Sequence, residues 1–92
     1  MSAARMVLKR HVLIEREGDG EDVVLIDSRT GRMSACNESA SIVVTELERG
    51  CSIVNLVEAL TQRFDVPSAV ATRDVNAVLD VLAAEGLLET SD

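Results

Sequence analysis

The segment 66–89, VPSAVATRDVNAVLDVLAAEGLLE, constrains the fold more than any other part of the chain, because its pattern predicts one long helix. Pro67 and Ser68 suit the first helical turn, and Gly86 can adopt the left-handed conformation that follows a helix C-terminus. One apolar stripe of this helix recurs at the spacing i, i+3, i+4 and i+7, which is typical of a core-facing side. The stripe comprises Val75, Val78, Leu79 and Leu82.

A second row of residues lies beside this stripe and contains one carboxylate. It comprises Val70, Asp74, Ala77 and Val81. The two rows together give an apolar face that is wider than one core contact normally needs. The extra width is a first indication of one wall of a groove. Packing within the core explains the same pattern and is the favoured interpretation of this pattern taken alone.

Three short strands are predicted ahead of the helices, over residues 7–15, 23–26 and 32–36. The acidic segment 17–22, which contains two glycines, and the segment 27–31, DSRTG, are predicted to form the turns between them. Strands joined by such short turns form an antiparallel meander in chain order. The third strand then lies at an edge of the sheet.

The edge of this third predicted strand is not protected by its sequence. The segment 32–36 contains no proline and no interior lysine, which natural proteins use to block pairing between strand edges. Alternation places Met33 and Ala35 on one face, and Ser34 and Cys36 on the other. We therefore expect that another chain can pair with the free N–H and C=O groups of this strand.

Two further helices are predicted between the third strand and the long helix. Asn37 and Ser52 are good N-cap residues, and Gly50 ends the first of these two helices. We expect Leu87 and Leu88, after the long helix, to form a short extended segment against the sheet. The apolar stripe of the first helix comprises Ala40, Val43, Val44 and Leu47.

These elements predict an α+β fold, a winged helix-turn-helix with an N-terminal three-stranded antiparallel sheet followed by three helices. We expect a single domain over residues 1–92, with an ordered core over about 7–89.

The charge balance excludes some classes of partner. The chain has 16 acidic and 9 basic residues, which gives a net charge of −7 at pH 7. Binding to a nucleic-acid backbone depends on Lys and Arg, and the long helix offers only Arg73 and Asn76 to base edges. No apolar run approaches the ~20 residues of a membrane span, and the N-terminus lacks a signal-peptide apolar region. We therefore expect a cytoplasmic protein with neither nucleic acid nor membrane as a partner.

The sequence contains no recognisable catalytic constellation. His11 is the only histidine, and a partly exposed position in a strand explains it. Cys36 and Cys51 form no CxxC pair, and with one histidine they do not complete a zinc site. We expect both thiols to be reduced, with a disulfide between them as the alternative. The prediction is a binding module without enzyme activity, cofactor or metal.

Several motifs follow one another in a recognisable order: a strand pair, CNESASIVVTELERG, a capped helix that ends in RFDV, and DVNAVLDVLAAEGLL. The most specific elements are Asn37-Glu38, Gly50, Phe64-Asp65-Val66, Asp74-Val75 and Gly86-Leu87-Leu88. In this order and spacing, over about residues 23–88, the chain resembles the PqqD-like family. That family provides the recognition elements of pathways that make ribosomally synthesised, modified peptides (RiPPs), including stand-alone proteins of lasso-peptide or PQQ biosynthesis.

The resemblance implies that the leader region of a precursor peptide adds as a fourth strand to the third predicted strand. Side chains of the leader would enter the cleft between that strand and the last helix. The module would then deliver the peptide to a maturation enzyme, either a radical-SAM protein or a leader peptidase. Carried onto this sequence, the binding strand is Arg32, Met33, Ser34, Ala35 and Cys36, and the helical wall is Val70, Asp74, Ala77, Val78 and Val81.

This sequence departs from the family pattern in its third strand. Cys36 stands where leucine is usual, and Ser34 and Ala35 stand where bulkier or aromatic residues are usual. An alternative interpretation is an acidic winged-helix transcription or adaptor module that acts through a protein partner. A structural piece of a larger enzyme complex is a third interpretation. A free edge also permits a weak homodimer.

Overall fold

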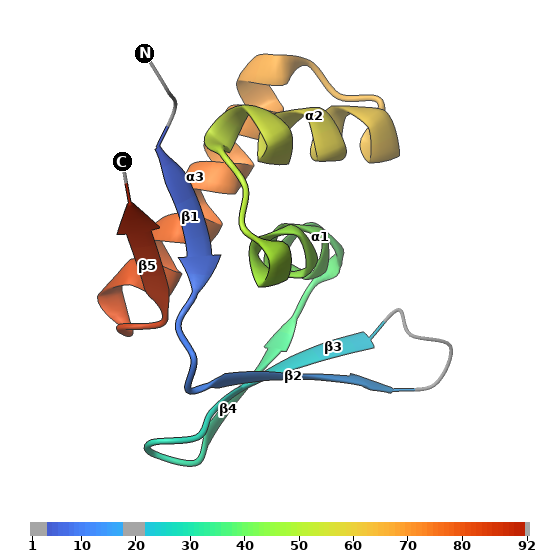
Figure 1. Cartoon of the computed structure of the whole chain (residues 1–92). Helices are drawn as coiled ribbons and strands as arrows, with labels where there is room; N and C mark the ends of the chain where they lie inside the picture. The colour runs from blue at the N-terminus through green and yellow to red at the C-terminus, as the bar shows by residue number, and fades with distance from the viewer. Residues whose placement is uncertain (1–3, 18–21, 92) are drawn as a thin grey trace.

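The computed structural model describes residues 4–17 and 22–91, and its helices and strands are arranged as Figure 1 shows. The strands are β1 (Arg5–Leu8), β2 (Val12–Glu17), β3 (Asp22–Asp27), β4 (Arg32–Cys36) and β5 (Leu88–Ser91), and the helices are α1 (Glu38–Arg49), α2 (Ile53–Phe64) and α3 (Ser68–Ala84). The predicted α+β class is confirmed. The turn predicted for 17–22 falls mainly on residues 18–21, outside the described residues. Within the described part of the chain, no helix has the length and apolar character to cross a bilayer.

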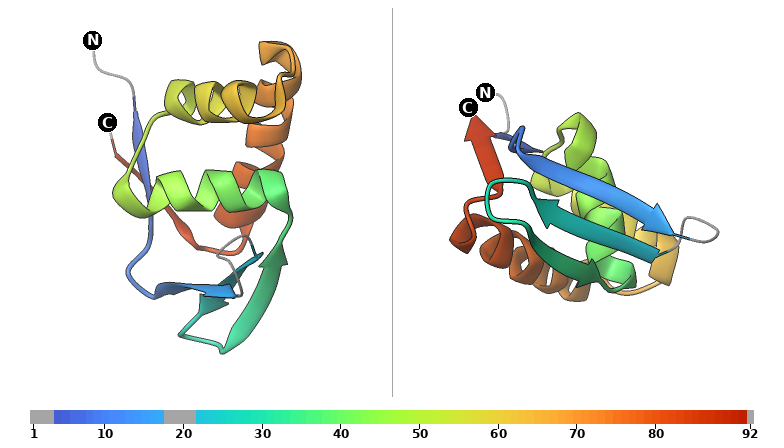
Figure 2. Two further views of the ribbon diagram at one scale, coloured as in Figure 1. Left: turned by 90° about the vertical axis from the view of Figure 1, so that its right-hand side faces the viewer. Right: turned by 90° about the horizontal axis from the view of Figure 1, so that it is seen from below.

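The strands β2, β3 and β4 form an antiparallel sheet in this order, which is the predicted meander with β4 at an edge. The register aligns Val23 with Cys36 and Leu25 with Ser34. Directly paired residues of an antiparallel sheet share a face. Ser34 and Cys36 therefore lie on the same side of the sheet as the buried Val23 and Leu25, which is the side that the helices cover in Figure 2.

The prediction of one N-terminal strand over residues 7–15 is wrong. The chain forms two strands there, β1 and β2. The N–H of Val12 donates to the carbonyl of Lys9 at 3.0 Å, which closes a turn between them. The consecutive polar residues 9–11 interrupt the apolar run at this point, and a change of direction separates the apolar residues of the two strands.

The strand β1 pairs with β5 in a separate two-stranded antiparallel sheet. The predicted extended segment at Leu87 and Leu88 is therefore present, but it pairs with β1 and not with the three-stranded sheet. The N–H of Lys9 donates to the carbonyl of Leu87 at 2.9 Å. Met6 and Cys51 exchange two backbone hydrogen bonds of 2.8 and 2.9 Å, which join β1 to the connection between α1 and α2.

The predicted N-caps of α1 and α2 are confirmed. Asn37 Oδ1 accepts a hydrogen bond from the N–H of Ala40 at 2.8 Å. Ser52 and Asn55 form a reciprocal capping box at the start of α2. These short-range bonds satisfy N–H groups that have no partner within the helix, so the two helices begin at defined residues.

The end of α3 is also defined by local hydrogen bonds. Gly86 has φ of +74°, a left-handed conformation that glycine adopts without steric cost. Its N–H donates to the carbonyl of Ala83 at 3.1 Å, and the N–H of Leu87 donates to the carbonyl of Leu82 at 2.9 Å. This pair of bonds is the Schellman motif, and the residues at its two outer positions, Leu82 and Leu87, are both buried.

The core lies between the helices and the inner face of β3. Its largest fully buried side chains are Leu47, Leu56, Leu60, Val43, Val44 and Val75. On α3, Leu79 and Leu82 are buried with Val75, whereas Val78 is half-buried and Val81 is 56% exposed. The core therefore uses only part of the apolar face of α3.

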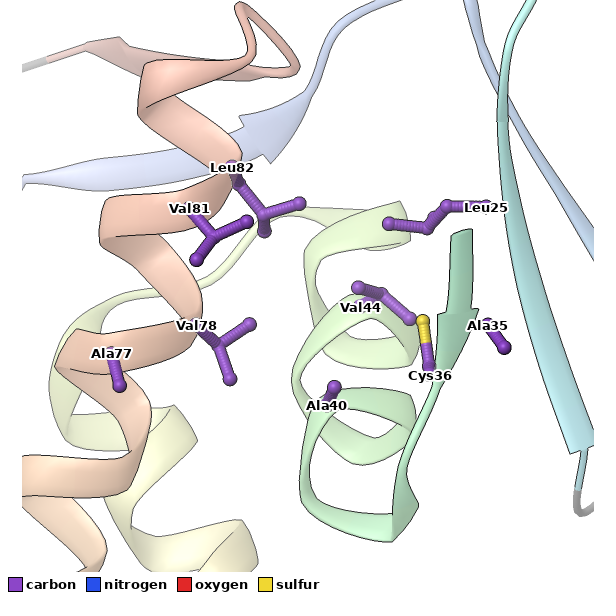
Figure 3. Close-up of a pocket in the computed structure, with 9 residues that line it drawn as sticks. All are labelled: Leu25, Ala35, Cys36, Ala40, Val44, Ala77, Val78, Val81 and Leu82. Atoms are coloured by element: carbon purple, nitrogen blue, oxygen red, sulfur yellow. The ribbon is translucent and has the colours of Figure 1, made fainter. Parts of the chain in front are cut away.

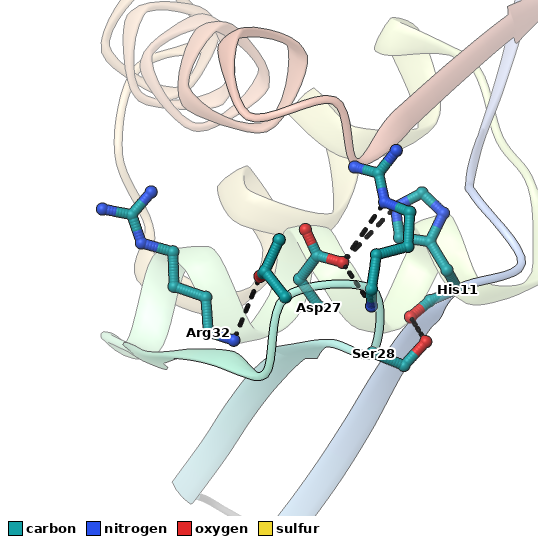
Figure 4. Close-up of polar contacts among 6 residues, drawn as sticks. His11, Asp27, Ser28 and Arg32 are labelled. Atoms are coloured by element: carbon teal, nitrogen blue, oxygen red, sulfur yellow. Dashed lines mark hydrogen bonds and ion pairs between the residues drawn. The ribbon is translucent and has the colours of Figure 1, made fainter.

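Asp27, the last residue of β3, is buried and organises the loop between β3 and β4 (Figure 4). Its Oδ1 accepts hydrogen bonds from the backbone N–H of Arg29 at 3.0 Å and from Arg29 Nε at 3.5 Å. The same oxygen lies 3.8 Å from His11 Nε2. The N–H and the hydroxyl of Ser28 both donate to the carbonyl of His11, at 2.9 and 2.7 Å. The cluster therefore fixes this loop against the turn that precedes β2.

Burial alone would raise the pKa of the Asp27 carboxyl. The hydrogen bonds from Arg29, together with the electrostatic effects of Arg29 and of His11, outweigh burial and lower this pKa below its ordinary value. A carboxyl with a lowered folded-state pKa stabilises the fold fully above its unfolded-state pKa. That stabilisation is lost as the pH falls through the folded-state pKa.

We therefore expect the free energy of unfolding to decrease as the pH is lowered from about 5 to about 2, with Asp27 as one contributor. The variant Asp27→Asn should be less stable than the wild type at neutral pH, and its stability should depend less on acid. Urea unfolding at a series of pH values measures both effects. The matched control is Asp80→Asn, at an exposed position on α3. Equal acid dependence in the two variants would contradict the assignment.

Candidate functional site

An apolar groove of about 300 Å³ opens between β4, α1 and α3. Its lining comprises Leu25, Ala35, Cys36, Ala40, Val44, Ala77, Val78, Val81 and Leu82. Figure 3 shows Val78 and Leu82 of α3 pointing across the groove toward α1 and β4. The Cys36 thiol is the only polar side-chain group in this lining, so the groove favours apolar ligand groups.

Half of the residues predicted for the site line this groove. They are Ala35, Cys36, Ala77, Val78 and Val81. The others lie on the same two elements but outside the lining. Arg32, Met33 and Ser34 are exposed on β4, and Val70 and Asp74 are half-buried on α3, nearer its N-terminus.

On the β4 side of the groove, only one side chain is directed into the lining. Ala35 is paired with Val24, whose side chain lies on the sheet face turned away from the helices, and Figure 3 shows the Cβ of Ala35 directed away from the groove. Ser34 and Cys36 face the helices, and of these two only Cys36 reaches the lining. The surface on this side of the groove is therefore formed by a small side chain and by the backbone of β4.

Four lining residues were not among those predicted for the site: Leu25, Ala40, Val44 and Leu82. Sequence analysis assigned Ala40, Val44 and Leu82 to the core stripes of their helices, and they lie where those stripes meet the groove. The available signal was a small residue on each facing helix, Ala40 on α1 and Ala77 on α3. Small side chains in the lining leave space between the elements unfilled.

The outer edge of β4 borders the groove, and within the described residues β4 pairs only with β3. The opposite edge strand, β2, lies on the far side of the sheet from α3 (Figure 2). Arg16 of β2 instead contacts α1, where its Nη2 donates to Thr45 Oγ1 at 3.1 Å and to Glu48 Oε1 at 2.9 Å. The free edge at β4 is therefore the one that has an apolar groove beside it.

The titratable group of the lining is held in its neutral form. Burial raises the pKa of the Cys36 thiol, so this side chain is protonated at neutral pH and behaves as a small apolar group. Cys51 is buried elsewhere in the core, and both cysteines are free thiols. Within residues 4–17 and 22–91, no group of three or more potential metal ligands occurs.

Comparison with known proteins identifies one matching family. Residues 22–88 match the family described as coenzyme PQQ synthesis protein D (PqqD). No curated protein matches the chain.

Solved structures with the same fold include two complexes with leader peptides. The first, lasso peptide synthetase B1 complexed with the leader peptide, has 26% identity and a TM-score of 0.77, over 91% of this chain and 96% of that one. The second, TbiB1 in complex with the TbiA(beta) leader peptide, has 26% identity and a TM-score of 0.80, over 90% and 94%.

A third solved structure is the PqqD truncation of Methylobacterium extorquens PqqCD, which its authors describe as a functional, stand-alone RiPP recognition element. It has 21% identity and a TM-score of 0.73, over 92% of this chain and 88% of that one. At this identity the similarity concerns the fold alone.

The burial on α3 separates residues of the core from residues of the groove. Leu79 is 7% exposed, so Leu79→Ala should lower the free energy of unfolding by about 2–5 kcal/mol, because it leaves a cavity. Val81 is 56% exposed, so Val81→Ala should change it by less than about 0.5 kcal/mol. Urea denaturation of the two variants gives both values. A Val81→Ala variant as unstable as Leu79→Ala would show that Val81 belongs to the core.

Proposed function

This chain belongs to the PqqD family, and on that premise we propose that it binds the leader segment of a ribosomally synthesised precursor peptide by strand addition to β4. The observation that carries the proposal is the free edge of β4 beside an apolar groove. An added strand gains affinity from main-chain hydrogen bonds and specificity from pockets for alternate side chains. Both requirements are met at the same edge.

The shape of the groove indicates what the leader contributes. Every second side chain of a strand that pairs with β4 would project toward α1 and α3. A volume of about 300 Å³ lies at the small end of the range for ligand pockets, which suits a few aliphatic side chains. Val78, Val81 and Cys36 would contact these side chains directly.

The predicted site residues that do not line the groove would contact the leader where it extends beyond the groove. Arg32, Met33 and Ser34 would contribute the backbone of β4 to the added strand. Val70 and Asp74 would meet the peptide beyond the groove, toward the N-terminus of α3. An ion pair between Asp74 and a basic leader residue would contribute only about 0–1 kcal/mol, because such partly exposed pairs remain screened by solvent.

We further propose that the chain is non-catalytic and delivers the leader, in the cytoplasm, to a maturation enzyme, either a radical-SAM protein or a leader peptidase. The groove supports a binding role without catalysis, because the only titratable group in its lining is a thiol whose pKa is raised. The free β4 edge also allows a weak homodimer, which a bound leader would displace because both would use the same backbone groups.

An NMR titration tests where the peptide binds. The leader of the cognate precursor peptide should shift the backbone amides of residues 32–36 and of the groove-facing part of 70–81, because these segments border the groove. Shifts that cluster instead on α2 would contradict the proposed site. A DNA duplex that shifts Arg73, Asn76 and Asp80 would favour the winged-helix transcription module.

A second experiment tests strand addition itself. Ala35→Pro removes a main-chain donor from β4 and should abolish leader binding, measured by fluorescence anisotropy, provided that circular dichroism shows an intact fold. Val81→Asp should also weaken binding, because it places a charge in the apolar groove.

Leader peptides with single N-methylated amides provide the matched control, since they leave the protein unchanged. In an added strand, alternate amides point toward the partner strand, so methylation should weaken binding with a period of two residues. Equal effects at neighbouring positions, or full affinity in a folded Ala35→Pro variant, would exclude strand addition to β4.

A further inference from the structure

The face of the three-stranded sheet that is turned away from the helices is unusually apolar. Val23, Leu25 and Asp27 of β3 are buried on the inner face, so the alternate residues of the sheet point outward. The described outward side chains are Leu13, Glu15, Val24, Ile26, Met33 and Ala35. We call this set the outer face, and it is turned toward the viewer in the right-hand view of Figure 2.

An apolar outer face departs from what a solvated sheet face normally shows. Antiparallel sheets with one covered face usually alternate apolar residues inward and polar residues outward. In β4 the exposed Met33 is directed outward, whereas Arg32 and Ser34 are on the inner side. Leu13 and Met33 are 52% and 62% exposed, and both are paired with Ile26, so they form one continuous apolar row across three strands.

We propose that the outer face docks the maturation enzyme that acts on the bound peptide. The inference rests on the proposed function, because strand addition at β4 would extend this same face. Every second side chain of the leader would lie beside Met33 and Ala35. The maturation enzyme has to reach the bound peptide. A surface that is continuous with the leader lets the enzyme contact this chain and the leader at the same time.

Charge distinguishes this occupant from a second copy of the chain. Glu15 is the charged side chain on the outer face among those described, and the whole chain has a net charge of −7. Two copies facing each other would bring these negative charges together, which is unfavourable. The partner surface is therefore apolar at its centre and carries Lys or Arg at the position that meets Glu15.

The test uses the variant Leu13→Ser in the full chain. Leu13 is 52% exposed on β2, at the sheet edge opposite β4, so the fold and the leader affinity should change little, within about twofold. Affinity for the cognate maturation enzyme, measured by biolayer interferometry with and without the leader, should fall about tenfold or more. Glu15→Lys should slow association at low salt, and this effect should disappear at high salt.

Val54→Ser is the matched control, because Val54 is 61% exposed on α2, away from the sheet. Wild-type affinity for the enzyme in Leu13→Ser, or an equal loss in Val54→Ser, would overturn the proposal. Sedimentation that shows a wild-type dimer, a monomeric Leu13→Ser variant and unchanged enzyme binding would assign the face to a second copy instead. A wild-type chain that does not bind the leader would remove the proposed function, whereas enzyme binding to the free chain would still decide the role of this face.

Discussion

The position of the groove depends on the pairing of the two end strands, β1 and β5. The strand β5 directly follows α3, and β1 directly precedes the sheet strand β2, so their antiparallel pairing fixes the end of α3 relative to the sheet. Met6 extends this constraint to the start of α2 through its two backbone hydrogen bonds with Cys51. The three-stranded sheet therefore needs no partner for β4 in order to be anchored. Its outer edge stays available because the anchoring is done elsewhere.

The cluster around the buried Asp27 adds a second link between the same two parts of the molecule. The Asp27 carboxylate holds the backbone and the guanidinium of Arg29. The Arg29 side chain in turn lies against Gly86, where a Cβ would come within 3.3 Å of its Nη2. The hairpin that leads into β4 and the turn that ends α3 are thus packed together at one end of the groove. Because β4 and α3 are held together at this end, they keep a defined separation along the groove, and no side chain has to fill the space between them.

Sequence patterns identified the features that depend on neighbouring residues. The caps at Asn37 and Ser52 and the stop at Gly86 each involve hydrogen bonds within a few positions, so residue type alone predicted them. The division of the N-terminal segment into β1 and β2 was missed, because β1 is stabilised by β5 at the other end of the chain. Pairing between distant segments leaves no periodic signal in either of them. The extra apolar width of α3 was visible, but Leu25 and Val44 could be recognised as groove residues only when three elements were placed together.

The chain leaves apolar side chains exposed although it has few large ones with which to build a core. Its 92 residues include a single aromatic side chain, Phe64, and a domain of this size buries only about 60–65% of the surface of its unfolded chain. Val81 in the groove and Met33 on the outer face are both more than half exposed, so neither contributes much to the stability of the isolated chain. A partner that covers such residues binds the folded state alone and stabilises it by mass action. Partners bound at the groove and the outer face, as proposed, would therefore add to the stability of this small fold.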